Sequence, residues 1–454
     1  MVFFCNFKPK LSGYFVKLKF YDTISIEKKK LGRFMNKKTI SIILAYVGVL
    51  TGAGLASGQE LMQYFIPFGN AGLYGLAAAG ALHIFVGGII LQMGSHFFAD
   101  SHIDVLQEVS EKYVTKFMDL SLLLNCFLMG FVMIAGAGSN LNQQFGMAPW
   151  IGSLICTIMI IVVGMLDFDK VTRVIGAFTP LVLVFTLIGG IYTIARIRPD
   201  FAALDTLSKT LKPSIPNIFI STINYFGMCM ISCISMAFVL GGSKTDSKEA
   251  RQGGMVGGAL VAILTGLIGF TLYIDLENLL DADIPMQIIL ENIHPYLGLA
   301  MSIIIFGMIF NTAISLFYSA AKRLSNTEGK LKQNLIIFTS VGFGLSFFGF
   351  KKLMSILYPI LGFIGTALVI ILVVAWIRER DSIKSEHKKR KMISFLTRKK
   401  LDDDIEFNKK DRENLERLAE ESIIDNDTIK EAVEEEVEEK LQEENSDREN
   451  EDSV

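Results

Sequence analysis

The stretch Thr51-Gly52-Ala53-Gly54-Leu55-Ala56-Ser57-Gly58-Gln59-Glu60 interrupts a long apolar segment, residues 39–67. Three glycines fall within seven residues of it, and a glycine in a helix interior costs about 1 kcal/mol relative to alanine. The stretch ends on Glu60, and a carboxylate inside a membrane segment is a candidate functional residue because its burial is expensive. We therefore predict a helix that is broken near Gly54 beside a buried acid.

Close packing between helices is the alternative explanation for any single glycine in a membrane segment. It accounts less well for a cluster such as Gly52, Gly54 and Gly58, which also has polar neighbours. Both explanations stay open for each glycine taken alone.

The charged residues are distributed unevenly along the 454 residues, of which 51% are hydrophobic. Residues 39–377 hold only 17 basic and 18 acidic side chains, which is too few to cover a soluble globule of that length. The five cysteines lack the spacing of a disulfide framework, which excludes a small secreted disulfide scaffold.

Ten segments have the length and apolar character of membrane helices, since about 20 residues cross a bilayer. They are 39–67, 72–97, 117–142, 149–166, 172–195, 215–240, 252–276, 298–321, 333–350 and 353–377. With the N-terminus inside, the inner flanks hold 24 Lys and Arg and the outer loops hold six. This bias predicts an all-α multi-pass protein of the plasma membrane with both termini in the cytoplasm.

The ten segments divide into two similar halves, 39–195 and 215–377. The second half also opens on a segment with polar and small residues, Asn224-Tyr225-Phe226-Gly227-Met228-Cys229-Met230-Ile231-Ser232-Cys233. Each half has a short amphipathic piece after its second segment, at 100–115 and 283–294. Five spans per half give opposite insertion, so we predict a 5+5 inverted repeat with spans 1 and 6 both discontinuous, near Gly54 and Gly227.

The motif Gly52-Ala53-Gly54-Leu55-Ala56-Ser57-Gly58-Gln59-Glu60 resembles the signature of the YkvI-type membrane proteins of Gram-positive bacteria. Those proteins belong to the amino acid–polyamine–organocation superfamily of transporters, which has the LeuT-like fold. The resemblance covers about residues 39–377. It implies a ten-helix transporter core, and it implies a substrate class only weakly.

A broken helix exposes unpaired N–H groups at one end and unpaired carbonyl groups at the other, so one break can hold both an anion and a cation. The predicted substrate-binding residues are Gly52, Ala53, Gly54, Ser57, Gly58, Asn125, Asn224, Tyr225, Gly227 and Ser232. For Tyr225 the alternative is helix packing. Cys229 and Cys233 lack a histidine or carboxylate partner, so no transition-metal site is expected.

Two hydroxyls of the eighth segment, Thr312 and Ser315, share one helix face. The resemblance implies that they meet carbonyl groups near Val49, Gly52 and Ala53 and form a sodium site there. Adjacent hydroxyls are the commoner pattern in such transporters, so the spacing found here departs from it. The alternative is that both hydroxyls bond to their own helix.

Glu60 is the strongest single candidate for a functional residue. It could act as a proton carrier, a cation ligand or a gate, and a structural carboxylate facing a vestibule is the alternative. No resident cofactor is expected, and the coupling ion is either Na⁺ or H⁺.

The ends of the chain differ from this core. Residues 1–38 are basic and are predicted to be either a cytoplasmic extension or the product of an upstream start before Met35. Residues 378–400 form a basic juxtamembrane segment, in which 384–400 are expected to meet anionic lipid. Residues 401–454 carry a net charge of −16 and are predicted to be largely disordered, with an amphipathic helix opening at Thr428.

The sequence thus favours a secondary active transporter, such as a symporter, for a small solute, most simply an amino acid or related zwitterion. The alternative is a non-transporting sensor or scaffold on the same fold that signals through its acidic tail, which could also bind a cytoplasmic partner. No catalytic set or nucleic-acid motif is present in the sequence, so neither an enzyme nor a nucleic-acid partner is expected.

Overall fold

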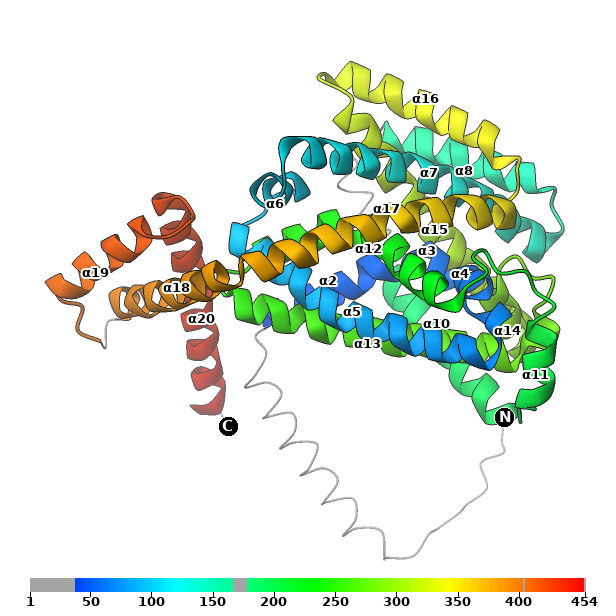
Figure 1. The fold of residues 1–454 in the computed structure, drawn as a ribbon, viewed down its shortest axis with the longest axis horizontal. Coiled ribbons are helices and arrows are strands. Elements are labelled where there is room, and N and C mark those ends of the chain that lie inside the picture. The colour runs from blue at the N-terminus through cyan, green and yellow to red at the C-terminus, as the bar shows by residue number, and fades with distance from the viewer. Residues whose placement is uncertain (1–36, 166–177, 403–404, 453–454) are drawn as a thin grey trace, which may run out of the picture.

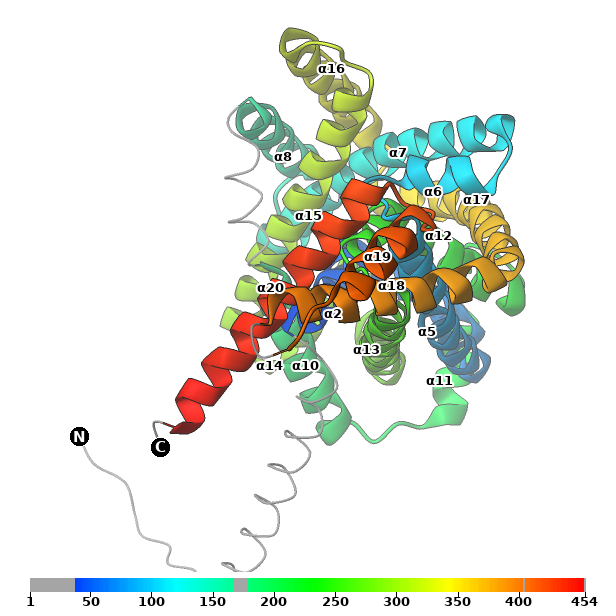
Figure 2. The same cartoon turned by 90° about the vertical axis from the view of Figure 1, so that its left-hand side faces the viewer.

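A computed structural model describes residues 37–165, 178–402 and 405–452, and within these ranges every regular element is a helix (Figure 1). The predicted extension, 1–38, lies outside the described residues except for its last two positions, and so does the start of the fifth predicted span, 172–177. Long helices form one bundle, and the last three helices project from one end of it (Figures 1 and 2). We call that end the tail end and the opposite end, which carries α11 (Phe201–Ser208), the far end.

Six described helices are long and apolar enough to cross a membrane. They are α5 (Asn70–Phe97), α7 (Lys112–Phe145), α12 (Ile218–Gly242), α13 (Ser247–Ile274), α15 (Pro295–Arg323) and α17 (Phe350–Arg378). Shorter apolar helices cover the remaining predicted spans, except that α16 is less apolar. These are α2 (Lys37–Leu50), α8 (Pro149–Gly164), α10 (Phe178–Arg196) and α16 (Glu328–Ser346).

The first predicted span is discontinuous, as the glycine cluster indicates. α2 ends at Leu50, α3 covers Ala53–Ser57, and α4 covers Gln59–Tyr64 before a 3-10 turn, η1 (Ile66–Phe68). Gly58 joins α3 to α4 with φ of 79°, in the left-handed region that favours glycine. The regular helical hydrogen bonding therefore stops at Thr51–Gly52, and the helix axis changes direction at Gly58.

The prediction that the sixth span is also broken is wrong. α12 runs as one α-helix through Gly227 from Ile218 to Gly242. A Cβ atom at position 227 would overlap the backbone oxygen of Gly362 in α17, and one at position 365 would overlap the oxygen of Gly227. Gly227 therefore serves close contact between two helices, which is the other common use of glycine in membrane segments.

The two short amphipathic pieces are present at matching places. α6 (His102–Val109) lies between α5 and α7, and α14 (Pro285–Ile293) lies between α13 and α15. Both bury their apolar side chains against the bundle. The prediction of paired short helices in the two halves is confirmed.

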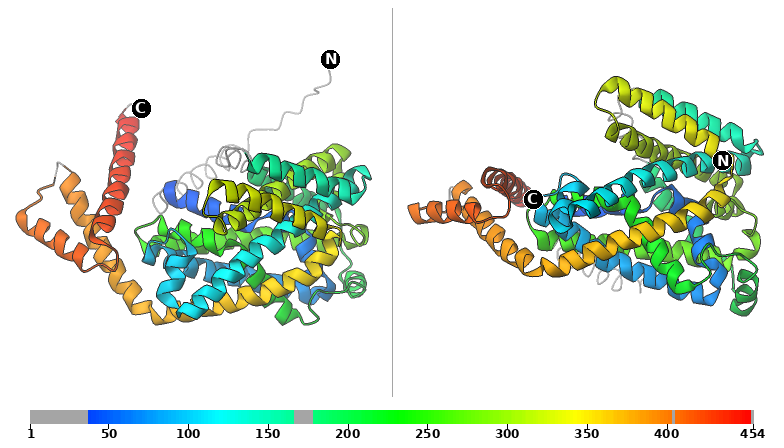
Figure 3. Two further views of the ribbon diagram at one scale, coloured as in Figure 1. Left: turned by 90° about the horizontal axis from the view of Figure 1, so that it is seen from above. Right: turned by 45° about the horizontal axis from the view of Figure 1, so that its top comes forward.

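The expectation of a largely disordered tail differs from the structure. α18 (Arg380–Leu401), α19 (Lys409–Glu420) and α20 (Asn426–Asp452) form a C-terminal unit beyond the tail end (Figure 3). The helix expected to open near Thr428 is α20. Apolar residues of all three helices bury one another: Ile393, Leu396, Leu415, Ala419, Ile429, Val433 and Val437. The acidic segment folds because basic α18 supplies both the missing apolar surface and counter-charges, as in the Lys399–Asp411 pair at 2.7 Å.

Replacing Gly227 by alanine should test the contact between α12 and α17. The added methyl group must push the two backbones apart, so we expect a loss of about 1–3 kcal/mol, measured as a lower midpoint of thermal unfolding in detergent. Gly266→Ala is the matched control, because a Cβ at that helical position in α13 meets no atom within 4 Å. Equal midpoints for the two variants would contradict this account.

Candidate functional site

A cavity of about 330 Å³ lies beside the break in the first span. Its walls come from α2, α3, α4, α7, α12 and α15 and from the break itself. The lining residues are Ala45, Gly48, Val49, Leu50, Gly52, Ala53, Gly54, Leu55, Glu60, Met129, Met133, Met228, Cys229, Ser232, Met308, Asn311, Thr312, Ser315 and Leu316. The predicted acid and both predicted hydroxyls thus border the same space as the predicted break.

Glu60 is the most unusual group in this cavity. Its side chain is buried, with 5 % of the residue exposed, and it has no hydrogen bond or ion pair within the described parts of the chain. A Cβ atom at position 54 would overlap the Glu60 carboxylate. Gly54, which has no side chain, therefore leaves room for that carboxylate. A buried charge without a partner is costly, and the cavity is therefore prepared to receive a positive group or a proton.

All five predicted coupling-ion residues, Ala53 included, line the cavity. Val49 and Gly52 come from the first span, and Thr312 and Ser315 face the same space from α15. Asn311 adds a side-chain oxygen that is buried without a hydrogen-bond partner. Hydroxyl, amide and backbone oxygens are the ligands that hard cations prefer.

Not all of the predicted substrate-binding residues reach the cavity. Ser57 donates a hydrogen bond to the Gly54 oxygen at 2.7 Å and accepts one from the Gln59 amide at 3.1 Å, so it stabilises the short helices α3 and α4. Gly58 forms the joint between these helices. Ser232 lines the cavity, and Asn125 lies behind it at 3.5 Å from the Ser232 hydroxyl.

Asn224 and Tyr225 lie on the far-end side of the cavity, where they form a closure with residues of the first span. The Tyr64 hydroxyl donates to the Asn224 side-chain oxygen at 3.0 Å, and Asn224 donates to the Pro359 oxygen at 2.8 Å. The Tyr225 ring lies 5.6 Å from the Tyr64 ring and 5.0 Å from the Phe65 ring. These contacts join α4, α12 and α17.

A second and larger cavity, of about 600 Å³, lies at the far end, beside residues 211–214, which follow α11. Gln59, Met62 and Gln63 of α4 line it together with Lys212 and Lys351. Gln59 and Glu60 are consecutive, yet they line different cavities. The six-residue helix α4 therefore stands between the two spaces.

Sequence reasoning missed four methionines and one tyrosine of this site. Met129, Met133, Met228 and Met308 line the cavity, and Met129 and Met133 are four apart in α7, on one helix face. Methionine is flexible and polarisable, so it adapts to varied apolar ligands. The spacing was visible in the sequence, but an apolar helix has many such pairs. Nothing in the sequence indicated that Tyr64 would meet Asn224.

The contact between Gly54 and Glu60 can be tested by a double-mutant cycle. Gly54→Ala should lower the midpoint of thermal unfolding, because its methyl group displaces the carboxylate. In a Glu60→Ala background most of that loss should disappear, giving a coupling energy of about 1 kcal/mol or more between the two sites. Gly52→Ala is the control within the same break, since a Cβ there meets nothing within 4 Å. Additive effects of Gly54→Ala and Glu60→Ala would contradict the proposed contact.

Comparisons with known proteins agree with this architecture. No family model matches the sequence. The chain is 22% identical over 332 residues to the uncharacterized membrane protein YkvI of Bacillus subtilis (strain 168), covering 72% of this chain and 93% of YkvI. It is 22% identical over 331 residues to the uncharacterized protein YyaD of the same organism, covering 73% and 94%. Among solved structures, MhsT in complex with L-phenylalanine superposes with a TM-score of 0.55 at 14% identity, covering 88% of this chain and 97% of MhsT. By its relatives the chain is similar to the YkvI-type membrane proteins, and it has the LeuT-like fold.

Proposed function

We propose that this protein is a secondary active transporter that moves a small solute across the plasma membrane by alternating access. The observation that carries the proposal is the cavity at the broken span, with an unpaired carboxylate inside it and a second cavity beyond α4. Substrate sites of inverted-repeat transporters lie at such breaks near the middle of the membrane.

The cavity walls suggest which side is open. Ala45 and Gly48 precede the break in α2, and Leu316 lies towards the end of α15, so the cavity extends from the break towards the tail end. The Tyr64–Asn224 hydrogen bond closes the other direction. The excess of Lys and Arg on the inner flanks makes the tail end cytoplasmic under this proposal, with both termini inside. The state described is then closed to the outside.

The chemistry of the cavity supports a solute that carries an ammonium group. No basic side chain is among the lining residues, whereas Glu60, Asn311 and Ser232 offer oxygen acceptors. Methionine and leucine side chains provide an apolar surface for the rest of the molecule. An amino acid or a related zwitterion fits this pattern if a cation beside it balances the solute's own carboxylate. MhsT, which shares the fold, was solved with L-phenylalanine.

We favour sodium as that cation. Thr312, Ser315 and Asn311 bring three side-chain oxygens to the cavity from one helix, and Val49, Gly52 and Ala53, beside the break, line the same cavity. In transporters of this kind, unwound backbone and half-helix ends coordinate the coupling ion. Glu60 then fixes the ammonium end of the solute. Proton coupling through Glu60 is the competing mechanism.

One observation favours a different function, a sensor or scaffold that signals through its tail. The C-terminal unit is folded and docked on the bundle, which a bare transporter does not require. Such a protein would bind a ligand in the cavity without moving it.

The basic stretch 384–400 remains a predicted contact with anionic lipid, although Arg390 and Lys399 form ion pairs with other residues of the protein.

Ligand binding should appear as thermal stabilisation. A solute present at about 100 times its dissociation constant stabilises the folded state by about 2.7 kcal/mol. Purified protein should be screened against amino acids, their decarboxylated amines and their deaminated acids, each in sodium or potassium chloride. We expect stabilisation by zwitterions in sodium, and none by the acids. Glu60→Gln should weaken that stabilisation. Stabilisation by the acids alone would overturn the proposed role of Glu60.

Uptake into proteoliposomes tests the coupling. Thr312→Ala and Ser315→Ala should each raise the sodium concentration needed for half-maximal uptake by roughly ten-fold, because each removes about one oxygen ligand or hydrogen bond. Thr157→Ala is a matched control, because the Thr157 hydroxyl bonds to the Ser153 oxygen of its own helix, away from the cavity. Full uptake without sodium would contradict sodium coupling. In that case Glu60→Gln should abolish uphill uptake while solute exchange continues, as proton coupling requires.

A further inference from the structure

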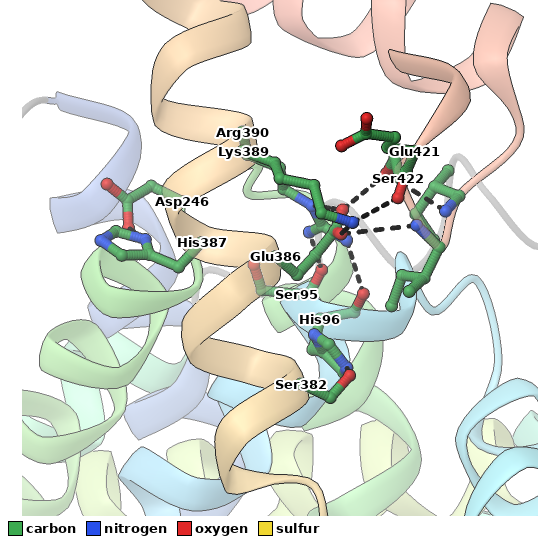
Figure 4. Close-up of polar contacts among 12 residues, drawn as sticks. Ser95, His96, Asp246, Ser382, Glu386, His387, Lys389, Arg390, Glu421 and Ser422 are labelled. Atoms are coloured by element: carbon green, nitrogen blue, oxygen red, sulfur yellow. Dashed lines mark hydrogen bonds and ion pairs between the residues drawn. The ribbon is translucent and has the colours of Figure 1, made fainter. Parts of the chain in front are cut away.

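The docked C-terminal unit is held to the bundle by a buried arginine of α18 (Figure 4). Arg390 is 3% exposed and donates hydrogen bonds to the backbone oxygens of Ser95 and His96, at 2.8 and 2.7 Å. These oxygens belong to the last turn of α5, where carbonyl groups lack the regular helical partner four residues on, although the Ser95 oxygen also accepts from the Phe98 amide at 3.3 Å. Glu386 balances the buried charge at 2.9 Å. Arg390 thus ends α5 and anchors α18 to it.

Glu386 also ties the rest of the unit to α18. The hydroxyl of Ser422, in the connection between α19 and α20, donates to Glu386 at 2.5 Å. The amide of Ile423 donates to its second oxygen at 3.4 Å. Burial would raise the pKa of Glu386, but the Ser422 hydrogen bond, the Arg390 guanidinium and the nearby Lys389 hold it below its ordinary value. The carboxylate is therefore charged and shared between the bundle anchor and the tail helices.

A second contact is made by α20. Glu436, itself buried, accepts hydrogen bonds from the hydroxyl and the amide of Thr245 in the turn between α12 and α13. Burial tends to raise the pKa of Glu436, but Lys440 at 2.7 Å and the Thr245 hydroxyl outweigh it and hold the pKa below its ordinary value. A charged side chain of the tail therefore holds this turn.

The same turn connects to α2, the first half of the broken span. Lys244, which precedes Thr245 and is 1% exposed, pairs with Glu249 of α13 at 3.1 Å. Glu249 also accepts a hydrogen bond from the hydroxyl of Thr39, near the start of α2. The contacts from Glu436 through the turn and Glu249 to Thr39 are therefore continuous.

We propose that the C-terminal unit, α18–α20, is a latch that holds the start of α2 against α13 and so regulates how far the cavity opens towards the tail end. α2 supplies the cavity wall on that side, at Ala45, Gly48 and Val49. Wider opening requires α2 to move away from α13, which breaks the bond between Thr39 and Glu249. Release of Glu436 from Thr245 loosens the turn that positions Glu249. The regulatory consequence for transport rests on the proposed function.

Cysteine labelling measures this opening without any transport assay. Cys229 lines the cavity, so a purified full-length variant that keeps Cys229 as its only cysteine reports access by its reaction with a water-soluble maleimide. Glu436→Gln keeps the side-chain shape and removes the charge. We expect Glu436→Gln to accelerate labelling about ten-fold, because it weakens one charge-assisted hydrogen bond that holds the closed arrangement. Glu438→Gln is the matched control, since Glu438 is exposed on the same helix.

A second variant acts at the other end of the same contacts. Thr39→Val should accelerate labelling to a similar extent, and combining it with Glu436→Gln should add little, because both release the same restraint. Unchanged labelling in both single variants, with normal thermal unfolding, would overturn the latch. If labelling accelerates but no variant transports any solute, the latch stands and the transporter proposal fails. If uptake is normal but labelling never changes, only the latch fails.

Discussion

The structure depends on one constraint: a backbone surrounded by lipid must satisfy its own hydrogen bonds. The first span departs from regular helix at Thr51–Gly52, and Gly58 then joins α3 to α4 with its own backbone groups hydrogen-bonded. Residues of α7, α12 and α15 line the cavity beside this break. α15 brings hydroxyl and amide oxygens to the break, and α7 and α12 surround it with methionines and a serine. Irregular backbone at membrane depth is tolerated where it lines a cavity inside protein, and that is its position here.

The sequence predicted the helices well, but of the two predicted breaks only the one in the first span is present. Glycines at 52, 54 and 58 marked a real break because one of them adopts a left-handed conformation. Gly227 gave the same signal for a different reason, since its partner, Gly362, lies 135 positions later and the contact exists only in three dimensions. A glycine needed for a break and one needed for packing look alike in a single sequence. The paired short helices were readable because each has a local apolar pattern.

Site residues could be predicted where one helix carries the feature, and could not be predicted where contacts between several helices create it. Glu60, Thr312 and Ser315 could be selected from their own segments, but the closure by Tyr64 and Asn224 and the place of Asn125 behind Ser232 depend on packing. The tail shows the same limit. Residues 401–454 considered alone have too little apolar surface to fold, whereas α18 and the bundle provide it.

The position of α4 also has an electrical consequence. Gln59 and Glu60 face different cavities across one helix, whose diameter with side chains is about 10–12 Å. Under the proposed function, water in the two cavities would confine most of the transmembrane voltage to that thickness. A unit charge crossing the full potential exchanges about 2.3 kcal/mol per 100 mV, and a charge passing α4 would exchange most of it within that short distance. A cation travelling with the solute past Glu60 would therefore draw on the membrane potential as well as on its own concentration gradient.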